Sequence, residues 1–406
     1  VQIDIKNNYY ISYKQHKIEY SNATISDEEF EEKLLSLVNL KVQDFQKLSL
    51  SLSGGMDSRV LFALLLNNRS EFFETHSFGN PNHHDCLIAN KMVRDLGIPH
   101  HQYNFKELDI DDTISDLQVY TIDNIVNNAA SSILQLNNYK FLSERNLVVV
   151  DGAPGEIWRH EYYFKILLSG KKSLLDGNIK DLISFLSMPR ADIFTEEINL
   201  KMQSGLTPQF EKVFKHLPKI SNENIREWLD LFAIRTRIPN YIGHEQGRLD
   251  SLITGVMPFA QISLLSNLFA LASKEKKNAL IFRKMIKHNS PRLAKYPLVK
   301  GTSEHPFYLN TFLSRVWPKV TSKFGHQYNE VSNTDILLPI LKDYIYDNIN
   351  SNLIKESSNM DHNKISKIVN NYFVNGSNGY ALDWLLSFII FKEAMTKNSN
   401  QYNQRI

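Results

Sequence analysis

The residues best suited to chemistry form one short loop, Ser53–Ser58, with the sequence SGGMDS. Its two glycines allow the backbone to approach a ligand closely, and the first N–H groups of a helix that follows point toward that ligand. The two serines add hydroxyl donors, and Asp57 adds a carboxylate. No Gly-Lys-Ser/Thr follows, and the pattern is not Gly-x-Gly-x-x-Gly. The loop therefore predicts a phosphate cradle that differs from both of these glycine-rich nucleotide loops.

Predicted strands and helices alternate around this loop. Leucine and serine alternate over 48–53, which predicts a central strand whose small serines allow a helix to pack closely, and 57–67 predicts the helix that follows. The other elements of the alternation are strands over 72–78, 101–105 and 147–152 and helices over 85–96 and 113–143. Such alternation favours a parallel sheet covered on both faces, with ligands bound at the carboxyl ends of the strands, where the loop lies.

The two ends of the sequence differ from this middle part. Residues 1–25 favour a β-hairpin, and 27–38 has the spacing of an amphipathic helix. After residue 157 the signals are mostly helical. We therefore expect an α/β protein with a largely helical C-terminal part.

Composition excludes several classes of protein. The chain has 406 residues, is 42% hydrophobic and carries a net charge of +2, so it lacks the basic footprint of a dedicated nucleic-acid binder. Its longest apolar runs, such as 60–66, are far shorter than the ~20 residues that span a bilayer. No signal peptide is recognisable, and Cys86 is the only cysteine. We expect no membrane and no nucleic-acid partner, and a cytoplasmic location.

The loop matches the Ser-Gly-Gly-x-Asp-Ser loop of PP-loop ATP pyrophosphatases, and further stretches resemble the synthetase domain of asparagine synthetase B-type enzymes. These stretches are 74–105, 148–163, 255–261 and 294–307, in the family's order. The resemblance implies the parallel sheet of a PP-loop, HUP-like domain. It divides the chain into residues 1–38, a hairpin and linker helix that are a candidate remnant of a glutaminase-like domain, and residues 39–406, the synthetase domain.

The resemblance also implies a role for each matching residue, with ATP and Mg²⁺ as cofactors. The residues that match ATP-binding positions are Ser53, Gly54, Gly55, Asp57, Ser58, Phe78 and Gly152. Asp57 and Glu156 match the two carboxylates of the magnesium site, and such hard oxygens suit Mg²⁺. Lys300 matches the lysine that stabilises charge on the acyl-adenylate, which makes it the predicted catalytic residue. Its segment, 295–305, contains Pro297 and Gly301 and predicts a mobile loop that closes over the nucleotide.

The sequence departs from the family around residue 153. Ala153 replaces a glutamate, or the tyrosine of the β-lactam-forming branch, and Ile157 replaces an acidic residue. Pro154 stiffens the same stretch, and Ala260-Gln261 replaces Leu-Asp. These differences disfavour aspartate itself as the substrate.

The nitrogen source is implied by the absence of the family's cysteine nucleophile. Glutamine-dependent members begin with a glutaminase domain whose first residue is cysteine, whereas residue 1 here is Val1 and the single cysteine lies in the synthetase half. The resemblance therefore implies that this chain does not itself hydrolyse glutamine. Nitrogen would come as ammonia, from a partner subunit or a missing N-terminal glutaminase-like domain, or as an amine of the substrate. The last route is that of lasso peptide cyclases and β-lactam synthetases.

The sequence thus predicts an ATP-dependent ligase that forms AMP and pyrophosphate while joining a small-molecule or peptide carboxylate to an amine. Peptide or natural-product amidation and macrolactam formation are included in this class. One alternative is an inactive nucleotide-binding interaction module, which the altered 153–157 stretch favours. The other is a PP-loop enzyme that modifies tRNA, which the balanced charge and the single cysteine disfavour.

Overall fold

The computed structural model describes residues 18, 20, 23–39, 47–68, 72–104, 109–122, 128–186, 190–301, 303–322 and 333–403, with backbone alone for 319–322 and 397–403. The predicted hairpin of 1–25 falls almost entirely outside these residues. The division of the chain at residue 38 stays a prediction.

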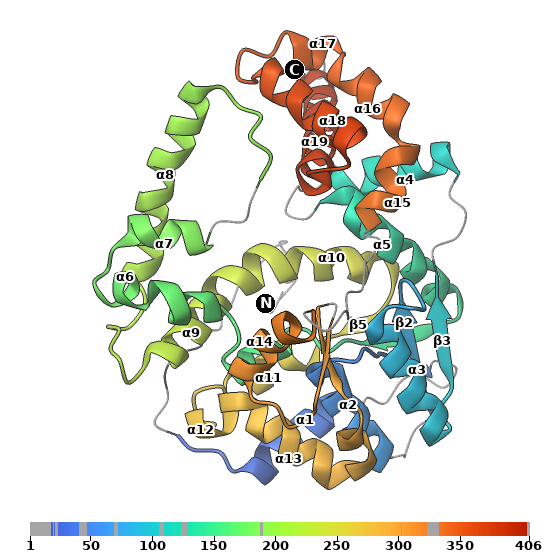
Figure 1. Cartoon of the computed structure of the whole chain (residues 1–406), viewed down its shortest axis with the longest axis vertical. Helices are drawn as coiled ribbons and strands as arrows, with labels where there is room; N and C mark the ends of the chain where they lie inside the picture. Colours follow the sequence, from blue (N-terminus) through green and yellow to red (C-terminus); the bar gives the residue numbers. More distant parts are fainter. Residues whose placement is uncertain are drawn as a thin grey trace, which may run out of the picture.

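The described residues contain a five-stranded parallel sheet, whose strands β2 and β3 are labelled on the right of Figure 1. Its strands are β1 (Lys47–Ser51), β2 (Phe73–Phe78), β3 (His100–Tyr103), β4 (Leu147–Val150) and β5 (Gly255–Val256). They are ordered β3-β2-β1-β4-β5, and every pairing is parallel. Strands β2 and β3 are added in turn on one side of β1, and β4 then pairs with the other side of β1. The end of β1 is therefore a topological switch point, where sheets of this kind bind ligands.

The alternation of leucine and serine in β1 is explained by the two faces of the sheet. Leu48 and Leu50 pack into the main core with Val148 of β4. Ser49 faces the other way, is fully buried and hydrogen-bonds His76 Nδ1 of β2 at 2.7 Å. Serine at this position therefore satisfies a buried polar ring, in addition to keeping that face small.

Helices cover both faces of the sheet. Those around the sheet are α1 (Asp27–Val38), α2 (Met56–Asn67), α3 (His84–Leu96), α4 (Ile110–Thr121), α5 (Ala129–Glu144), α10 (Gly243–Leu252) and α13 (Leu280–Asn289). Helices α1, α2 and α13 share the main core with β1. Helix α5 packs Tyr139 and Leu142 against Val149 of β4 on the opposite face. The predicted sheet with two covered faces is confirmed.

Two helical lobes flank the sheet, each with a core of its own (Figure 1). One consists of α6 (Lys171–Leu175), α7 (Ile179–Leu186), α8 (Glu196–Lys215) and α9 (Ile225–Arg237). The other packs α4 and α5 against α15 (Asn333–Ile340), α16 (Lys342–Ile349), α17 (Asn352–Lys355), α18 (His362–Asn375) and α19 (Gly379–Asn403).

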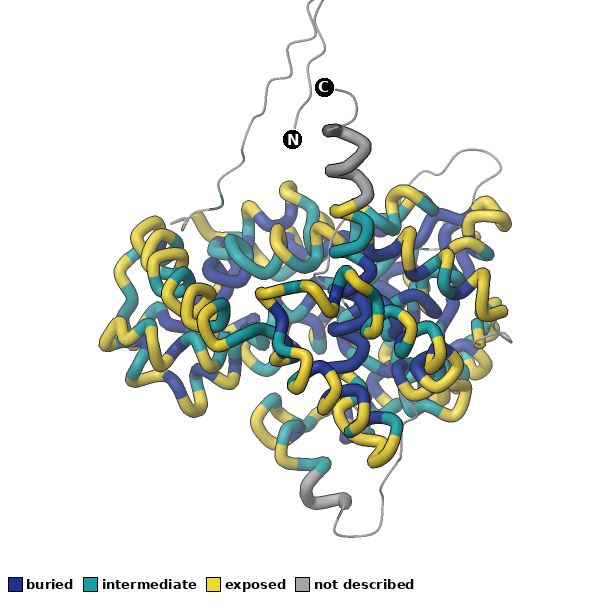
Figure 2. The backbone as a smooth tube through the Cα atoms, turned by 90° about the horizontal axis from the view of Figure 1, so that it is seen from above, coloured by how far each residue is buried: buried dark blue, intermediate teal, exposed yellow. Residues whose placement is uncertain are grey.

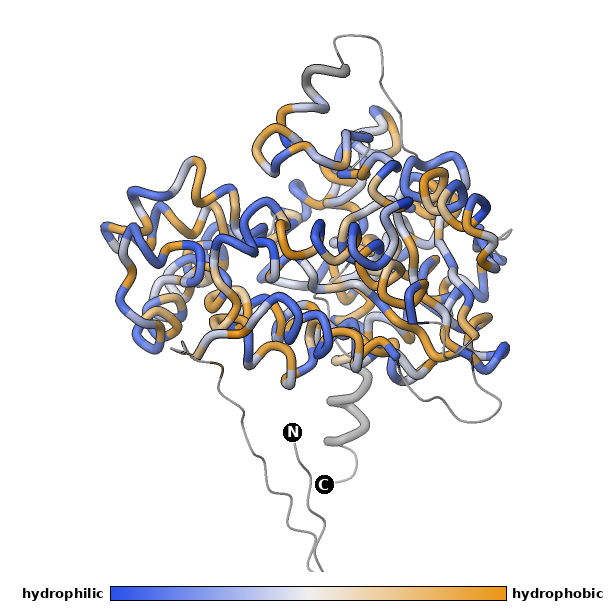
Figure 3. Tube along the Cα trace, turned by 90° about the horizontal axis from the view of Figure 1, so that it is seen from below, coloured by the Kyte–Doolittle hydropathy of each residue, from blue (hydrophilic) through white to orange (hydrophobic). Residues whose placement is uncertain are grey.

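Burial and hydropathy follow this division into a central body and two lobes. Figure 2 shows buried residues gathered in the body and an exposed outer edge on the first lobe, where α8 contains no buried residue. Figure 3 shows hydrophobic and hydrophilic stretches alternating along that lobe, as expected for amphipathic helices. None of the described helices is both long and apolar enough to cross a membrane.

The remaining elements include α11 (Ile262–Leu265), α12 (Ser273–Lys276), β6 (Leu298–Lys300), β7 (Ser303–His305) and α14 (Thr311–Ser322). Helix α12 packs on α13, β6 contacts α3, and β7 contacts α14. Strands β6 and β7 pair in antiparallel register and form what we call the lysine hairpin.

The structure differs from the sequence-based expectation in a few elements. The region 113–143 is two helices, α4 and α5, rather than one. Strand β5 and the two strands of the lysine hairpin were not predicted. Each of these strands has only two or three residues and is stabilised by the elements that it contacts. The predicted helix over 27–38 is confirmed, and Ser26 and Glu29 form a capping box at its start. Gly97 ends α3 with a φ of 68°, as expected.

Candidate active site

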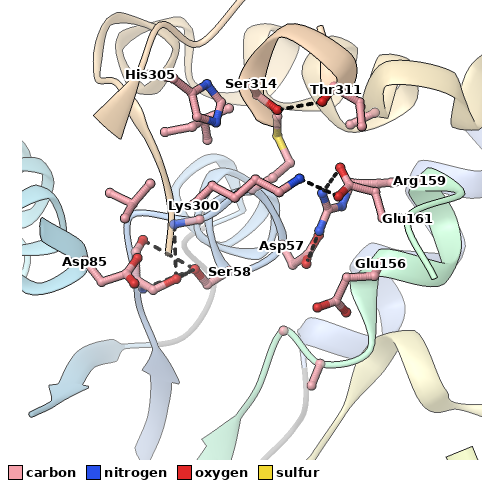
Figure 4. Close-up of a pocket in the computed structure, with 18 of the residues that line it drawn as sticks. Asp57, Ser58, Asp85, Glu156, Arg159, Glu161, Lys300, His305, Thr311 and Ser314 are labelled. Atoms are coloured by element: carbon pink, nitrogen blue, oxygen red, sulfur yellow. Dashed lines mark hydrogen bonds and ion pairs between the residues drawn. The ribbon is translucent and has the colours of Figure 1, made fainter. Parts of the chain in front are cut away.

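A cleft of about 450 Å³ opens beside the carboxyl ends of β1 and β4 (Figure 4). One wall is the PP-loop with the start of α2, and a second is the loop after β4 with the 3₁₀ helix Gly155–Arg159. The third wall is the lysine hairpin with α13 and α14. The polar and charged residues that line it are Ser51, Ser53, Asp57, Ser58, Asp85, Asp151, Glu156, Arg159, Glu161, Arg283, Lys300, His305, Thr311 and Ser314.

The PP-loop is closed by hydrogen bonds to its own and neighbouring side chains. The Ser53 N–H donates to Ser58 Oγ at 3.1 Å, and the Gly55 N–H donates to Ser53 Oγ at 3.1 Å. The Gly54 N–H donates to Oδ1 of Asp85, in the first turn of α3, at 2.9 Å. Phosphate oxygens entering this loop would therefore compete with protein oxygens for the same N–H groups.

Three glycines allow the walls of the cleft to approach one another. A Cβ on Gly54 would collide with the side chain of Val299 in the lysine hairpin. On Gly152 it would lie 2.8 Å from the backbone nitrogen of Ser58, and on Gly155 it would collide with Asp57. The sequence predicted contact of Gly54 and Gly152 with ATP. The structure adds a second reason for glycine there, namely room for other parts of the protein.

Asp57 and Glu156 lie near each other on one side of the cleft, as Figure 4 shows. Asp57 Oδ1 is buried and has no hydrogen-bond partner among the described residues, while Oδ2 accepts from Arg159 Nη2 at 2.7 Å. No group of three or more His, Cys, Asp or Glu side chains that could hold a metal occurs in the described part of the chain. Two carboxylates, one with an unused oxygen, fit a magnesium ion that keeps water and phosphate ligands.

Alternating charges connect this carboxylate pair to Lys300. Arg159 Nη1 donates to Glu161 Oε1 at 2.9 Å. Glu161 Oε2 in turn accepts from Lys300 Nζ at 2.7 Å and from Arg315 Nη2 at 3.0 Å. Figure 4 shows the Lys300 side chain crossing the cleft toward Glu161. Through Arg159 and Glu161, the predicted metal site and the predicted catalytic lysine therefore belong to one network.

His160 fixes the segment that carries this network. It has a left-handed φ of 53° and is buried, and its Nδ1 lies 2.6 Å from Asp230 Oδ2 while its Nε2 lies 3.0 Å from Ser273 Oγ. The buried Nζ of Lys276 approaches the same Asp230 oxygen at 3.5 Å. A non-glycine residue in this conformation needs such support. Held there, His160 points away from the cleft while its two neighbours, Arg159 and Glu161, reach into it.

Burial and charge shift the pKa values of the network in different directions. Burial raises the pKa of Asp57 to about 7, against the lowering effect of Arg159. Burial also raises the pKa of Glu161, but Arg159 and Lys300 outweigh it, so the net shift is downward. The pKa of Lys300 is lowered by burial, which Glu161 partly offsets. Perturbed groups of this kind in one cleft are typical of functional sites.

Arg59 of α2 fixes the segment that leads into the lysine hairpin to the PP-loop. This arginine is fully buried and donates to the carbonyl oxygens of Gly54, Leu293, Tyr296 and Pro297 at 2.7–3.3 Å. In addition, the N–H of Val299 donates to the Gly54 carbonyl at 3.0 Å.

The expectation that the segment 295–305 lies outside the core is wrong for β6, whereas its mobility stays a prediction. Leu298 and Val299 are buried in the main core, because Arg59 and the glycine at position 54 let the hairpin pack on the PP-loop.

A second cavity of about 610 Å³ adjoins the cleft and shares Ser51, Ser53 and Asp85 with it. Phe78 lines this cavity rather than the cleft. Its other lining residues include Leu52, Ser77, Asn80, Cys86, Asn104, Gln135 and Asn333. The mixture of apolar surface with amide and hydroxyl groups suits a nucleoside.

The structure thus places the predicted site residues in two connected spaces. Ser53, Gly55, Asp57, Ser58, Gly152, Glu156 and Lys300 line the cleft, Gly54 lies directly behind it, and Phe78 lines the second cavity. Sequence reasoning missed Asp85, Arg159, Glu161, Arg283 and Arg315. The run Arg159-His160-Glu161 was a usable signal, because closely spaced opposite charges follow a predicted glycine-containing loop. Ile157, in a position where the family has an acid, is fully buried in the core and therefore does not reach the cleft.

Comparison with known proteins supports part of this description. Residues 29–150 match the family described as Asparagine synthase, which confirms the resemblance over the segment that contains the PP-loop. That segment ends before Gly152, Glu156 and Lys300. No curated protein matches the sequence significantly. A solved structure of an NMN synthetase from Francisella tularensis is 19% identical, with a TM-score of 0.24 over 34% of this chain and 58% of that chain. The chain therefore aligns with little more than half of that protein.

Proposed function

We propose that this protein is an ATP-dependent ligase that joins a carboxylate to an amine and releases AMP and pyrophosphate. The observation that carries the proposal is the meeting of the PP-loop, Asp57, Glu156 and Lys300 at one cleft. The family match at 29–150 supports the coarser statement that the chain resembles ATP-using ligases. The adjoining cavity at Phe78 supports a nucleotide that extends from the cleft into a pocket for its base.

In the proposed first step, an oxygen of the substrate carboxylate attacks the α-phosphorus of ATP, and the bond between that phosphorus and the pyrophosphate oxygen breaks. The PP-loop and Lys300 face the departing pyrophosphate. Magnesium bound at Asp57 and Glu156 would neutralise phosphate charge. Asp57 would hold the ion through Oδ1, the oxygen without a partner among the described residues, while Arg159 stays on Oδ2 and is placed beside the phosphates.

In the proposed second step, the amine nitrogen attacks the acyl carbon and the bond from that carbon to the AMP oxygen breaks. Charge develops on the acyl oxygen, and the ammonium of Lys300 is the cation that crosses the cleft. Glu161 holds that ammonium at 2.7 Å and so limits its freedom before the reaction. The amine loses a proton after attack, and water or the phosphate of the departing AMP accepts it.

We further propose that the nitrogen reaches this chain as ammonia, as an amine of the substrate, or from a partner that hydrolyses glutamine. A small-molecule or peptide carboxylate is the proposed acid.

Carboxylate-dependent exchange of labelled pyrophosphate into ATP tests the first step without any knowledge of the amine. We expect a carboxylate to be found that supports exchange in the wild type, and Lys300→Ala to abolish that exchange. ATP binding without exchange for a broad panel of carboxylates would reject the ligase.

The second candidate is a nucleotide-binding module without catalysis, and one observation favours it. The protein's own groups already occupy key positions, with Arg159 on Asp57 and Asp85 on the Gly54 N–H. The same exchange experiment separates the two, because a module binds ATP and does not cleave it.

A further inference from the structure

Arg283 of α13 is a partly buried cation that forms no ion pair among the residues that the structure describes. Its Nε donates to the carbonyl oxygen of Asn278 at 2.9 Å, and its Nη2 donates to that of Leu309 at 2.9 Å. The guanidinium lies over the ring of Phe307, 5.1 Å from its centroid. Nη1 is buried and has no hydrogen-bond partner among the described residues. The side chain is thus held in place while one of its donor groups remains unused.

The other cations in and beside the cleft form ion pairs with carboxylates, which distinguishes them from Arg283. Arg159, Lys300 and Arg315 each form an ion pair with Asp57 or Glu161. No ion pair to Arg283 is found in the described ranges. Burial lowers the pKa of Arg283 to about 10, so the group still carries its charge at neutral pH. A charge that is partly withdrawn from water and has no counter-ion is costly, and an anionic ligand would offset that cost.

The surroundings of Arg283 suit a phosphate group. Thr311 and Ser314, at the start of α14, line the same wall of the cleft, and Figure 4 shows both side chains there. The Asn278 amide oxygen accepts the Thr311 N–H at 3.2 Å, which ties the start of α14 to the segment that holds Arg283. Guanidinium and hydroxyl donors on one wall are typical of phosphate recognition.

The position of Arg283 relative to the cavity at Phe78 indicates which part of a nucleotide Arg283 would bind. Arg283, Thr311 and Ser314 line the cleft and do not line the cavity at Phe78. The two spaces meet at Ser51, Ser53 and Asp85. A nucleotide with its base in the cavity and its phosphates over the PP-loop therefore directs its terminal phosphates toward the Arg283 wall.

We propose that Arg283, with Thr311, forms an anion subsite for the β- and γ-phosphates of ATP and for the pyrophosphate that leaves. This inference rests on the proposed function and adds a residue to it. In the PP-loop, the N–H of Gly54 donates to Asp85 and the N–H of Gly55 donates to Ser53. Because these donors are already in use, Arg283 on the opposite wall would supply further donors to the phosphates. Arg283 then stabilises charge on the leaving group as its bond to the α-phosphorus breaks.

Calorimetric titration with Mg²⁺-pyrophosphate, Mg²⁺-ATP and AMP tests the subsite in the absence of any acyl substrate. We expect Arg283→Met to weaken pyrophosphate and ATP binding about tenfold or more, because a charged hydrogen bond is lost. AMP binding should change by less than about twofold, because AMP lacks the phosphates concerned. Arg292→Met, which removes an exposed arginine from the neighbouring 291–295 helix, is the matched control and should bind all three as the wild type does.

The remaining outcomes separate the subsite from the ligase. Wild-type pyrophosphate affinity in a folded Arg283→Met overturns the subsite, even if Arg283 proves necessary for some other anion. A wild type that binds neither ATP nor pyrophosphate overturns the proposed function and the subsite together. If Arg283→Met does not fold, the variants Arg283→Lys and Thr311→Val test the subsite instead. Each should weaken pyrophosphate binding more than AMP binding, and equal effects on both ligands reject the subsite.

Discussion

At the scale of single residues, the cleft is organised by competition between protein groups and a ligand for the same partners. Asp57 accepts from Arg159, and the N–H of Gly54 donates to Asp85. Both contacts involve groups that the proposed reaction needs for metal and phosphate. A phosphate would give Arg159 a further partner of opposite charge. The Asp85 carboxylate, displaced from the Gly54 N–H, would still lie beside the His83 ring, whose Nδ1 is 3.7 Å away.

Lys300 is the residue on which the proposed chemistry depends most. Its removal leaves Glu161 paired with Arg159 and Arg315, so Lys300→Ala does not strand a buried charge. If the ammonium acts on charge that develops in the transition state, we expect kcat to fall about a hundredfold or more, with a smaller change in ATP affinity. Steady-state kinetics with an identified substrate pair provide the measurement.

Two variants make the Lys300 result interpretable. Lys300→Arg should recover only part of the rate, because a planar guanidinium does not replace a point ammonium. Lys295→Ala removes an exposed lysine from the segment just before the hairpin and should keep wild-type kinetics. A kcat for Lys300→Ala close to that of the wild type would remove the residue from the mechanism.

At the scale of elements, Arg59 is the link between the PP-loop and the lysine hairpin. We expect Arg59→Met to lower the free energy of unfolding by about 3 kcal/mol or more, because it deprives several buried carbonyl oxygens of a charged donor. Arg59→Lys should recover only part, since one ammonium nitrogen cannot replace both Nη1, which donates to Tyr296, and Nη2, which donates to Gly54. Denaturant unfolding measures stability, and hydrogen exchange over 293–300 reports on the hairpin.

Arg94→Met is the control for Arg59, because the Arg94 side chain is 79% exposed on α3. It should leave both stability and exchange unchanged. Exchange rates over 293–300 that stay at wild-type values in Arg59→Met would contradict the proposed link.

Asp383 of α19, in the second helical lobe, makes the stability of the folded protein depend on pH. Its carboxylate accepts the N–H groups of Ala130 and Ser131 at the start of α5 at 2.8 and 3.0 Å. Burial raises its pKa to about 6, although the hydrogen bond from Ser131 opposes the shift. The native state therefore favours the protonated form. Ionisation as the pH rises from about 4 to above 6 costs the folded protein more than the unfolded chain, by about 3 kcal/mol in total.

The variant Asp383→Asn cannot ionise and should lack this component. We expect the free energy of unfolding of the variant, relative to the wild type, to rise as the pH increases from 4.5 to 7.5 (about 3 kcal/mol at most). Asp347→Asn, at an exposed position of α16, should show no such trend. Denaturant unfolding at several pH values provides the comparison, and parallel curves for Asp383→Asn and the wild type would contradict the assignment.

The elements that could be predicted from sequence are those specified by local pattern. The strand over 48–53 and the helix after it follow from alternation and from an apolar run, and Gly97 marks a helix end. The lysine hairpin could not be predicted, because the segment that leads into it is held by three carbonyl contacts from Arg59, which lies more than 200 residues earlier.

At the scale of the whole molecule, the same distinction applies to the site. Residues within a recognisable motif, such as Asp57 and Ser58, could be assigned from the sequence and now line the cleft. Arg283 and Arg315 lie in amphipathic helices where arginine is ordinary, so no sequence signal marked them. Only the folding of α13 and α14 over the PP-loop brings them to the cleft.

The source of nitrogen depends on whether any part of this chain can hydrolyse glutamine, and the candidate cysteine for that reaction is Cys86. Cys86 is the only cysteine in the sequence, and its side chain is 2% exposed. Its thiol donates to the carbonyl oxygen of Phe78 at 3.5 Å, and burial raises its pKa. A nucleophilic cysteine needs an accessible thiolate with a lowered pKa. Cys86 has neither property, so it cannot serve as a glutaminase nucleophile in this structure.

We therefore expect glutamine to give no product with this chain alone, while ammonia or an amine substrate supports turnover with the same carboxylate. Cys86→Ala should keep that turnover, since the cysteine only fills space beside the cavity at Phe78. Product formation from glutamine and from ammonium chloride, with glutamate release recorded in parallel, gives the measurement. Glutamine-dependent turnover that Cys86→Ala abolishes would overturn this assignment. Glutamine-dependent turnover that survives Cys86→Ala would instead require another nucleophile in the chain, and would equally remove the need for an external nitrogen donor.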